Sequence, residues 1–184
     1  MRFGEVEIFQ VEIPLIPRIA RVMPKIYDIT ICRLRTDEGI DGIAEGSRGL
    51  SVFRAYVDEL IKPLIVGMSP LQPRQIWETL ALGTRERATR FPSQIVGAID
   101  VACWDIMGKA AGLPIYALLG GARRTEIPLY WSRGNGWRKE PEEMLEEVQE
   151  GYEKGYRAFK VRMDWRDYRQ DSDPAKDLAI FQKC

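Results

Sequence analysis

Residues 98–121 read AIDVACWDIMGKAAGLPIYALLGG, and this stretch decides how the chain folds. Its first part predicts a helix with one apolar face, because apolar side chains recur at helical spacing at Ile99, Ala102, Cys103, Ile106 and Ala110. Gly112 is expected to adopt the left-handed conformation that ends a helix, and Pro114 cannot continue the helix. The stretch therefore predicts a helix with a defined stop and a rigid exit.

The same helix carries features that concern its neighbours. Asp105 and Lys109 are four residues apart, a spacing at which opposite charges stabilise a helix surface. Ala98, Ala102 and Gly108 leave room for another element to approach closely. An ordinary buried helix explains each of these features taken singly.

The ordered string as a whole indicates more than a buried helix. Ala-Ile-Asp-x-Ala-x-x-Asp-x-x-Gly-Lys, followed after four residues by Pro-Ile-x-x-Leu-Leu-Gly, resembles the signature of the mandelate racemase/muconate-lactonizing family of the enolase superfamily. The resemblance runs from the N-terminal strands to residues 160–162. It implies an α+β capping domain followed by a (β/α)8 TIM-type barrel. It also implies Mg²⁺ on three barrel carboxylates, which stabilises the enediolate formed when the proton α to a substrate carboxylate is removed.

Composition excludes several other classes of protein. Among the 184 residues, the number of Lys and Arg is 27 and the number of Asp and Glu is also 27. The chain therefore has no excess of basic residues that would indicate binding to nucleic acid or to an anionic membrane. No apolar run approaches the roughly 20 residues of a membrane span, and the N-terminus lacks the apolar region of a signal peptide. Histidine is absent, which excludes Ser-His, Cys-His and His-metal chemistry within the chain. Three scattered cysteines, Cys32, Cys103 and Cys184, indicate a reducing cytoplasm.

Three strands and then three helices are expected before residue 121, which is the order of an α+β domain. The strands are expected at residues 3–13, 26–35 and 40–45, as an antiparallel meander. In the first strand the apolar Val6, Ile8, Val11 and Ile13 stand among polar residues, and in the second strand Ile29, Ile31 and Leu34 are predicted to face inward. Thr30, Arg33 and Arg35 are predicted to face outward.

The first helix follows the apolar residues from Phe53 to Leu64, and Pro63 should end or bend it. A second helix begins at Pro73 and the third near Pro92.

The pattern changes at Glu126. A short strand at 127–131, a helix from Pro141, a strand at 158–163 and a helix from Pro174 are expected in turn, which is typical of βα units in a parallel sheet. Gly155 is expected to cap the first of these helices. We therefore divide the chain into a capping domain at 1–121 and the start of a barrel at 122–184. Since a whole barrel takes about 250 residues, this part holds about two of eight units.

Lys160 and Arg162 are the best candidate catalytic residues. Side chains two positions apart share one face of a strand, so both cations point the same way. A solvated strand face explains this pattern from spacing alone, whereas the interior of a barrel strand would require a function for it. By resemblance, Lys160 would interact with the substrate carboxylate. The family typically has Lys-x-Lys here, so Arg162 departs from its pattern, and a guanidinium is a poor base but a good carboxylate clamp.

Two capping-domain loops are candidate substrate-binding segments, and solvent-exposed loops are the equal alternative. The first loop carries Arg18, Arg21 and Met23, and the second carries Ser47 and Arg48. No metal ligand is assigned, because by resemblance the metal carboxylates lie on later barrel strands. The resemblance thus implies Mg²⁺ for an intact relative, and none is expected on this chain.

These observations predict the N-terminal part of a metal-dependent enzyme that abstracts the proton α to a carboxylate. A sugar-acid dehydratase is expected, since Arg162 in place of the second lysine of the family's Lys-x-Lys favours a reaction with one base. A racemase, epimerase or cycloisomerase of the same family is the alternative enzyme. A non-catalytic module that acts as an interaction or oligomerisation surface is the alternative outside the enzymes. The expected partners are a small-molecule carboxylate and further copies of the chain, without nucleic acid or membrane, and the 184 residues alone are expected to be inactive.

Overall fold

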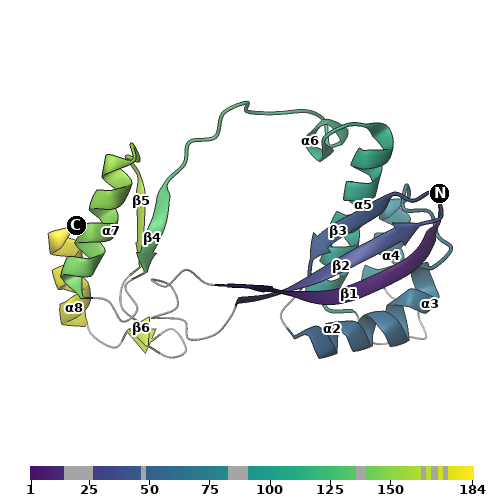
Figure 1. The fold of residues 1–184 in the computed structure, drawn as a ribbon, viewed down its shortest axis with the longest axis horizontal. Helices are drawn as coiled ribbons and strands as arrows, with labels where there is room; N and C mark the ends of the chain where they lie inside the picture. Colours follow the sequence, from purple (N-terminus) through teal and green to yellow (C-terminus); the bar gives the residue numbers. More distant parts are fainter. Residues whose placement is uncertain are drawn as a thin grey trace. The chain divides into compact units, whose positions relative to one another are not determined.

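The computed structural model describes residues 1–14, 27–46, 49–82, 91–135, 140–162, 165–166, 170–171 and 174–184. The chain divides into two compact units, unit 1 at Met1–Arg123 and unit 2 at Arg124–Cys184. Figure 1 shows the order of their helices and strands along the chain.

Unit 1 begins with the expected three-stranded antiparallel meander. Its strands are β1 (Phe3–Ile13), β2 (Tyr27–Thr36) and β3 (Asp41–Glu45), and their order in the sheet is β1-β2-β3. The turn between β2 and β3 closes on Thr36, whose hydroxyl donates to the carbonyl of Ile40 at 2.9 Å. Gly39 occupies this turn with a φ of 77°, a conformation that favours glycine.

The prediction of which β2 side chains face the core was correct for Leu34 but wrong for Ile29, Ile31 and Thr30. The buried side chains are Thr30, Cys32 and Leu34, whereas Ile29 and Ile31 are half-buried on the opposite face. β2 carries apolar residues on both of its faces, so alternation alone could not distinguish them. The face of β2 that the helices cover is the one with the small side chains of Thr30 and Cys32.

The apolar side chains of β1 divide between its two faces. Val6 and Ile8 are buried together with Phe3, but Val11 and Ile13 are on the other face, 41% and 40% exposed. The pairing with β2 shifts register between Phe3 and Glu5. This irregularity lets both an odd-numbered and an even-numbered side chain of the strand enter the core.

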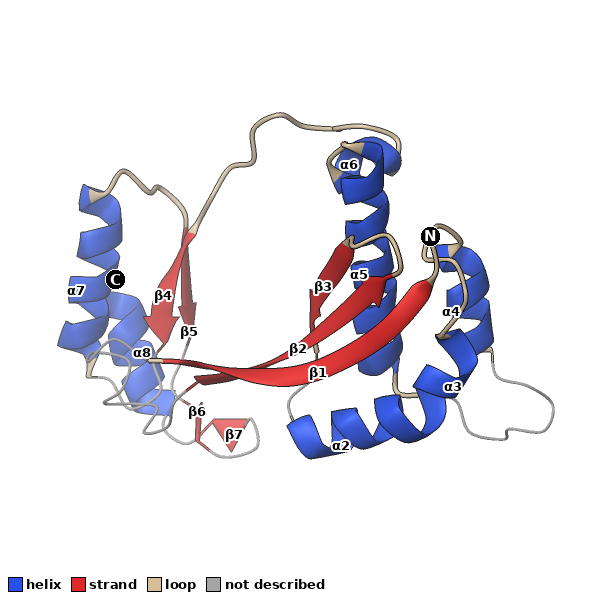
Figure 2. Cartoon of the chain, turned by 45° about the vertical axis from the view of Figure 1, so that its right-hand side comes forward, coloured by secondary structure: helices blue, strands red, loops and turns tan. Residues whose placement is uncertain are grey.

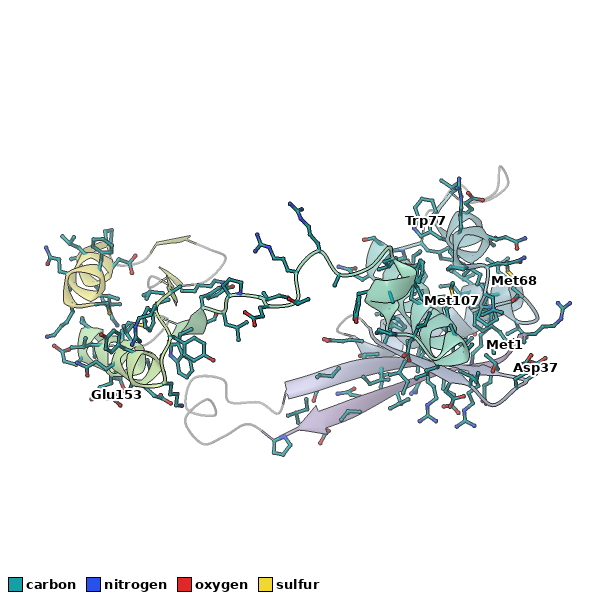
Figure 3. All side chains as sticks on the ribbon, turned by 90° about the horizontal axis from the view of Figure 1, so that it is seen from above. Met1, Asp37, Met68, Trp77, Met107 and Glu153 are labelled. Atoms are coloured by element: carbon teal, nitrogen blue, oxygen red, sulfur yellow. The ribbon has the colours of Figure 1, made fainter. Side chains whose placement is uncertain are left out.

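Helices cover one face of this sheet, as Figures 2 and 3 show for unit 1. They are α2 (Leu50–Tyr56), η1 (Val57–Ile61), α3 (Lys62–Ile65), α4 (Pro73–Ala81), α5 (Ser93–Ala111) and α6 (Ile115–Leu118). The expected first helix is thus a run of three segments, in which the π-helical η1 ends at Ile61, two residues before Pro63. Proline lacks the N–H of a regular helix and clashes with the preceding turn, which accounts for the altered hydrogen-bond pattern.

The helix predicted from residues 98–121 is α5, and it is the centre of the core. Its buried residues include Ile99, Ala102, Cys103 and Ile106, while Ala110 is exposed, contrary to the prediction. Gly112 follows the helix with a φ of 64°, as expected. The N–H of Leu113 then donates to the carbonyl of Gly108 at 2.9 Å. This bond closes the last turn and fixes the exit toward Pro114.

The Asp105–Lys109 pair does more than stabilise a helix surface. Lys109 Nζ lies 2.6 Å from Asp105 Oδ2, and the same ammonium donates to the carbonyl of Asp41 in β3. Asp105 Oδ2 also accepts the backbone N–H of Ile43 in β3, at 2.9 Å. The pair therefore attaches α5 to the edge strand of the sheet.

Unit 2 consists of two βα units, as predicted. β4 (Trp131–Asn135) is followed by α7 (Pro141–Glu153), and β5 (Phe159–Arg162) is parallel to β4. A short antiparallel pair that was not predicted, β6 (Trp165–Arg166) and β7 (Gln170–Asp171), follows β5, and α8 (Pro174–Lys183) comes last. The N–H of Tyr156 donates to the carbonyl of Gly151, and Gly155 has a φ of 94°, so Gly155 ends α7 as expected.

The first strand of unit 2 lies later in the sequence than predicted. β4 begins at Trp131, where the predicted strand ended, and Ile127 and Leu129 are exposed in an extended segment before it. The spacing of Ile127, Leu129 and Trp131 at every second position is typical of a strand. The strand nevertheless begins only at Trp131, which is the first of these residues to pack against α7. No helix among the described residues is long and apolar enough to span a bilayer.

Candidate functional site

The two parallel strands of unit 2 have one face covered by α7. Trp131 and Phe159 are paired across β4 and β5, and both rings lie against Gly151 of α7. A Cβ on Gly151 would lie 2.6 Å from the Trp131 ring and 2.9 Å from the Phe159 ring, so only glycine permits this approach. The indole N–H of Trp131 also donates to the carbonyl of Glu147, at 2.9 Å. These contacts fix which face of the strands is turned toward the helix.

Lys160 lies on the other face. It directly follows Phe159 in β5, and successive side chains of a strand point to opposite faces. Lys160 is exposed, whereas Phe159 and Val161 on either side of it are half-buried. The candidate lysine therefore projects from the side of β5 that α7 does not cover.

Arg162 is the last residue of β5, and the register pairs it with Asn135, the last residue of β4. The carboxyl ends of the two strands are therefore level. Asn135 was not predicted to end a strand, because the predicted strand stopped at Trp131. No local signal in the sequence marks the later start of β4, because it depends on the packing of Trp131 against Gly151 of α7.

The other predicted site residues lie outside the described residues. Residues 15–26 contain Arg18, Arg21 and Met23, and residues 47–48 are Ser47 and Arg48. Their roles remain predictions.

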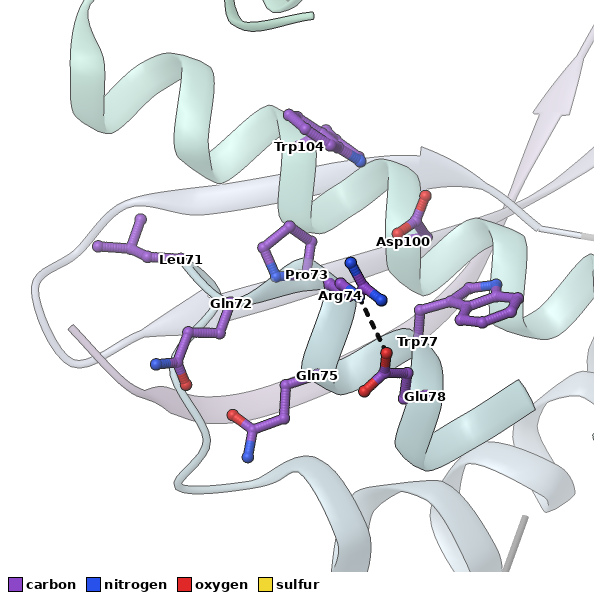
Figure 4. Close-up of a pocket in the computed structure, with 9 residues that line it drawn as sticks. All are labelled: Leu71, Gln72, Pro73, Arg74, Gln75, Trp77, Glu78, Asp100 and Trp104. Carbon is purple, nitrogen blue, oxygen red and sulfur yellow. Dashed lines mark hydrogen bonds and ion pairs between the residues drawn. The ribbon is translucent and has the colours of Figure 1, made fainter. Parts of the chain in front are cut away.

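A hollow of about 740 Å³ lies between α4 and α5 in unit 1. Figure 4 shows Asp100 and Trp104 on α5 opposite Arg74, Trp77 and Glu78 on α4. Burial raises the pKa of Asp100, and a hydrogen bond from Trp104 partly opposes this rise. Arg74 Nε donates to Glu78 at 2.9 Å. Since these polar groups have partners within the hollow, we assign no catalytic role to them.

The described residues contain no group of three or more Asp, Glu, His or Cys side chains that could hold a metal ion. Divalent magnesium needs carboxylates held in place around it. The described part of the chain therefore does not fit a magnesium site of its own.

Comparison with known families identifies the chain. Residues 5–120 match the model of the mandelate racemase/muconate lactonizing enzyme N-terminal domain. The chain belongs to this family. The expected fold class is confirmed: an α+β capping domain is followed by the first two βα units of an incomplete (β/α)8 barrel.

Two curated relatives and one solved structure illustrate the similarity. The D-galactonate dehydratase family member RspA of Halomonas elongata is 37% identical over 133 residues, covering 71% of this chain and 32% of that protein. The cis-3-hydroxy-L-proline dehydratase of Roseibium aggregatum is 33% identical over 178 residues, covering 89% of this chain and 45% of that protein. A mandelate racemase/muconate lactonizing enzyme homologue from Roseovarius nubinhibens, solved with magnesium, is 27% identical with a TM-score of 0.74, covering 100% of this chain and 48% of that one. The chain thus spans a third to a half of the length of these relatives.

Proposed function

We propose that this chain supplies the capping domain and the first barrel strands of a sugar-acid dehydratase of the mandelate racemase/muconate lactonizing enzyme family, with the boundary between these domains near residue 121. The observation that carries the proposal is the exposed Lys160 on the face of β5 that α7 leaves uncovered. In a (β/α) barrel the helices cover the outside, so this face is the interior. The names of the curated relatives, which are dehydratases, support the reaction class.

Lys160 would bind the substrate carboxylate. Its ammonium is a compact charge with three donors, and its position on β5 is close to the carboxyl end of the strand, where barrel active sites are built. Stabilising negative charge on the substrate carboxylate favours loss of the neighbouring proton, because the enediolate carries more charge than the ground state.

Arg162 would clamp the same carboxylate. A guanidinium stays protonated in proteins and presents two parallel N–H donors to a carboxylate. It therefore positions the substrate rather than accepting its proton. A site with Arg162 at this position favours a reaction with one base, such as elimination of water, over racemisation with a base on each side of the substrate.

The side chains that would bind the metal are not among the described residues. When bound, Mg²⁺ would stabilise the charge that develops on the substrate carboxylate. Because the described part of the chain has no cluster of metal-ligating side chains, we expect the 184 residues alone to bind no magnesium stoichiometrically and to turn over no sugar acid. Calorimetry with MgCl₂ tests this expectation, and one tight, stoichiometric site would contradict it.

Two further properties belong to this proposal. We expect the enzyme to be a homo-oligomer that acts on a small sugar acid. We also expect it to reside in the cytoplasm, because Cys32 and Cys103 are buried free thiols and Cys184 is an exposed one.

The proposal is tested with the longest polypeptide that the natural gene encodes from Met1. It is assayed against a panel of aldonic acids for the 2-keto product of dehydration, with and without magnesium. Product formation that is lost in Lys160→Met supports the proposal. A racemised or epimerised product would favour the alternative isomerase, and the absence of any conversion or α-proton exchange would favour a non-catalytic module.

A further inference from the structure

The hollow between α4 and α5 is bordered by aromatic side chains that stand apart from the core of unit 1. Trp77 on α4 and Trp104 on α5 both line it, as Figure 4 shows. Trp77 is 45% exposed, and Trp104 is half-buried. Tryptophan side chains are highly buried on average, so two indoles at the border of one open hollow indicate a binding surface.

One carboxylate of the hollow has no described cation paired with it. Asp100 lies one helical turn before Trp104, on the same face of α5. It is half-buried, and the hydrogen bond that it accepts from Trp104 brings no charge. Figure 4 marks an ion pair between Arg74 and Glu78 and none to Asp100. Among the described residues that line the hollow, the charges of Arg74 and Glu78 therefore cancel, and the negative charge of Asp100 remains.

These charges favour one class of ligand over the others. An anion would be repelled by Asp100, and Arg74, the cation among the described lining residues, already donates to Glu78 at 2.9 Å. A neutral apolar ligand would take the Asp100 carboxylate further out of water without giving it a partner, which costs free energy. A cation with an apolar body meets both features, because a charged donor bonds strongly to a carboxylate and indole faces attract cations.

We propose that the hollow between α4 and α5 binds a small organic ammonium ion, whose charged group donates to Asp100 and whose hydrocarbon body packs against Trp77 and Trp104. The volume of about 740 Å³ lies within the range of roughly 300–1,000 Å³ that is typical of small-molecule sites. Every residue of this site belongs to unit 1, whereas Lys160 and Arg162 belong to unit 2. The proposal therefore does not rest on the proposed function.

The exposure of the lining residues sets the expected strength. Leu71 and Trp77 remain 47% and 45% exposed, so part of a bound ligand would stay in contact with water. Attraction between a cation and an indole is weak at exposed sites and grows as the cation is desolvated. One charge-assisted hydrogen bond to Asp100 adds to it. We therefore expect a dissociation constant of about 1 mM.

The test is a titration with phenethylammonium chloride, in which the indole N–H signals of the chain are followed by two-dimensional ¹H–¹⁵N NMR. Phenethyl alcohol and 3-phenylpropionate, which have a similar shape but no charge and a negative charge, are the matched probes. The chain has five tryptophans. We expect two indole signals to shift and saturate with the ammonium ion alone, and these two to be the signals that disappear in Trp77→Phe and in Trp104→Phe.

Two variants test the contribution of single side chains. Asp100→Asn removes the charge and keeps the shape of the side chain, so it should raise the dissociation constant about tenfold or more. Asp58→Asn is the matched control, because it changes the net charge equally but lies on η1 outside the hollow, where Asp58 pairs with Lys62. It should leave the dissociation constant unchanged. Trp77→Leu removes one indole and should also weaken binding, and it decides the question if Asp100→Asn does not fold.

Each other outcome overturns the proposal. Equal shifts with phenethyl alcohol would show an apolar surface without selectivity for charge, and larger shifts with 3-phenylpropionate would show an anion site. A dissociation constant that Asp100→Asn leaves unchanged would place binding elsewhere. Binding by the 184-residue chain that is lost in the longest polypeptide encoded by the gene would show that the rest of the protein covers the hollow. None of these readouts depends on dehydratase activity, so failure here is distinguishable from failure of the proposed function.

Discussion

The carbonyl oxygen of Ala102 in α5 lies 2.1 Å from the position that a Cβ on Gly42 of β3 would occupy. Cγ1 of Ile106 is 2.7 Å from the same position. The edge strand therefore approaches the backbone of the central helix as closely as two backbones can pack. This approach requires a glycine on the strand, and it lets the Asp105–Lys109 pair reach the backbone of β3.

Gly42→Ala should destabilise unit 1 strongly. The added methyl group would overlap a backbone oxygen, which cannot rotate away as a side chain can, so the sheet and helix must separate. We expect the free energy of unfolding to fall by at least about 2 kcal/mol, measured by urea denaturation of the whole chain.

Gly97→Ala is the control for this prediction. Gly97 is on α5, the helix that Gly42 approaches, but a Cβ on Gly97 would meet nothing within 4 Å. Alanine is the better helix former, so this variant should gain about 0.5–1 kcal/mol. Equal effects of the two substitutions would contradict the close approach between Gly42 and Ala102.

Asp105→Ala should also destabilise the chain, because one carboxylate holds two partners. It accepts from the Ile43 N–H and from Lys109, and its removal leaves both donors without that acceptor. The expected loss is about 1–3 kcal/mol in urea denaturation. Glu78→Ala breaks the comparable pair with Arg74 on α4, whose arginine is largely exposed, and should cost no more than about 0.5 kcal/mol. A cost for Asp105→Ala as small as that of Glu78→Ala would mean that the pair does not attach α5 to β3.

Local chemistry made α5 predictable from sequence. The apolar spacing from Ile99 to Ile106, the left-handed Gly112 and Pro114 all act within a few residues of one another, and the structure follows them. The sequence also predicted that β4 and β5 pair in parallel, because a helix joins the two strands. The sequence was informative wherever the cause of a structure lies nearby in the chain.

Properties that depend on distant partners were not predictable in the same way. β2 has isoleucines on one face and Thr30, Cys32 and Leu34 on the other, and the packing of α5 and the neighbouring strands decides which face is buried. The start of β4 depends on Trp131 meeting Gly151, which is 20 residues further along the chain. The same holds for the candidate site, because the level strand ends at Asn135 and Arg162 follow from the register of β4.

The three thiols should differ sharply in reactivity. Burial raises the pKa of Cys32 and of Cys103 to about 12, so almost no thiolate forms at these positions near neutral pH. Cys184 is exposed. We expect a disulfide reagent to modify Cys184 quickly in the native chain and the other two only after unfolding, because the thiolate is the reactive form.

The same shifts predict a loss of stability in alkali. The unfolded chain releases these two protons near its ordinary thiol pKa of 9.0, whereas the folded chain holds them until about 12. Proton release therefore favours the unfolded state as the pH rises through this range. Urea denaturation at several pH values should show the free energy of unfolding falling above about pH 9. Cys32→Ala with Cys103→Ala should flatten this dependence, and an unchanged slope would assign it to other groups.

Arg162→Lys tests the role proposed for the end of β5, in the longest polypeptide that the gene encodes. Lysine keeps the charge but loses the planar fork, so two parallel hydrogen bonds to a carboxylate become one. A charge-assisted bond of this kind contributes about 1.5–3 kcal/mol, so kcat/KM for dehydration should fall about 10- to 100-fold. Arg157→Lys is the matched control. Arg157 is exposed in the same unit and donates to the carbonyls of Tyr152 and Tyr156, so its replacement should leave kcat/KM unchanged.

Proton exchange distinguishes a clamp from a base at this position. If Arg162 holds the substrate carboxylate, Arg162→Lys should not speed the entry of deuterium at the substrate α-carbon in heavy water, as followed by NMR. If Arg162 instead stands where a base acts, the lysine can lose its proton and accept one from the substrate, because a lysine pKa shifts readily on burial whereas a guanidinium stays charged. Faster exchange in Arg162→Lys than in the wild-type enzyme would therefore refute the clamp and favour the racemase or epimerase alternative.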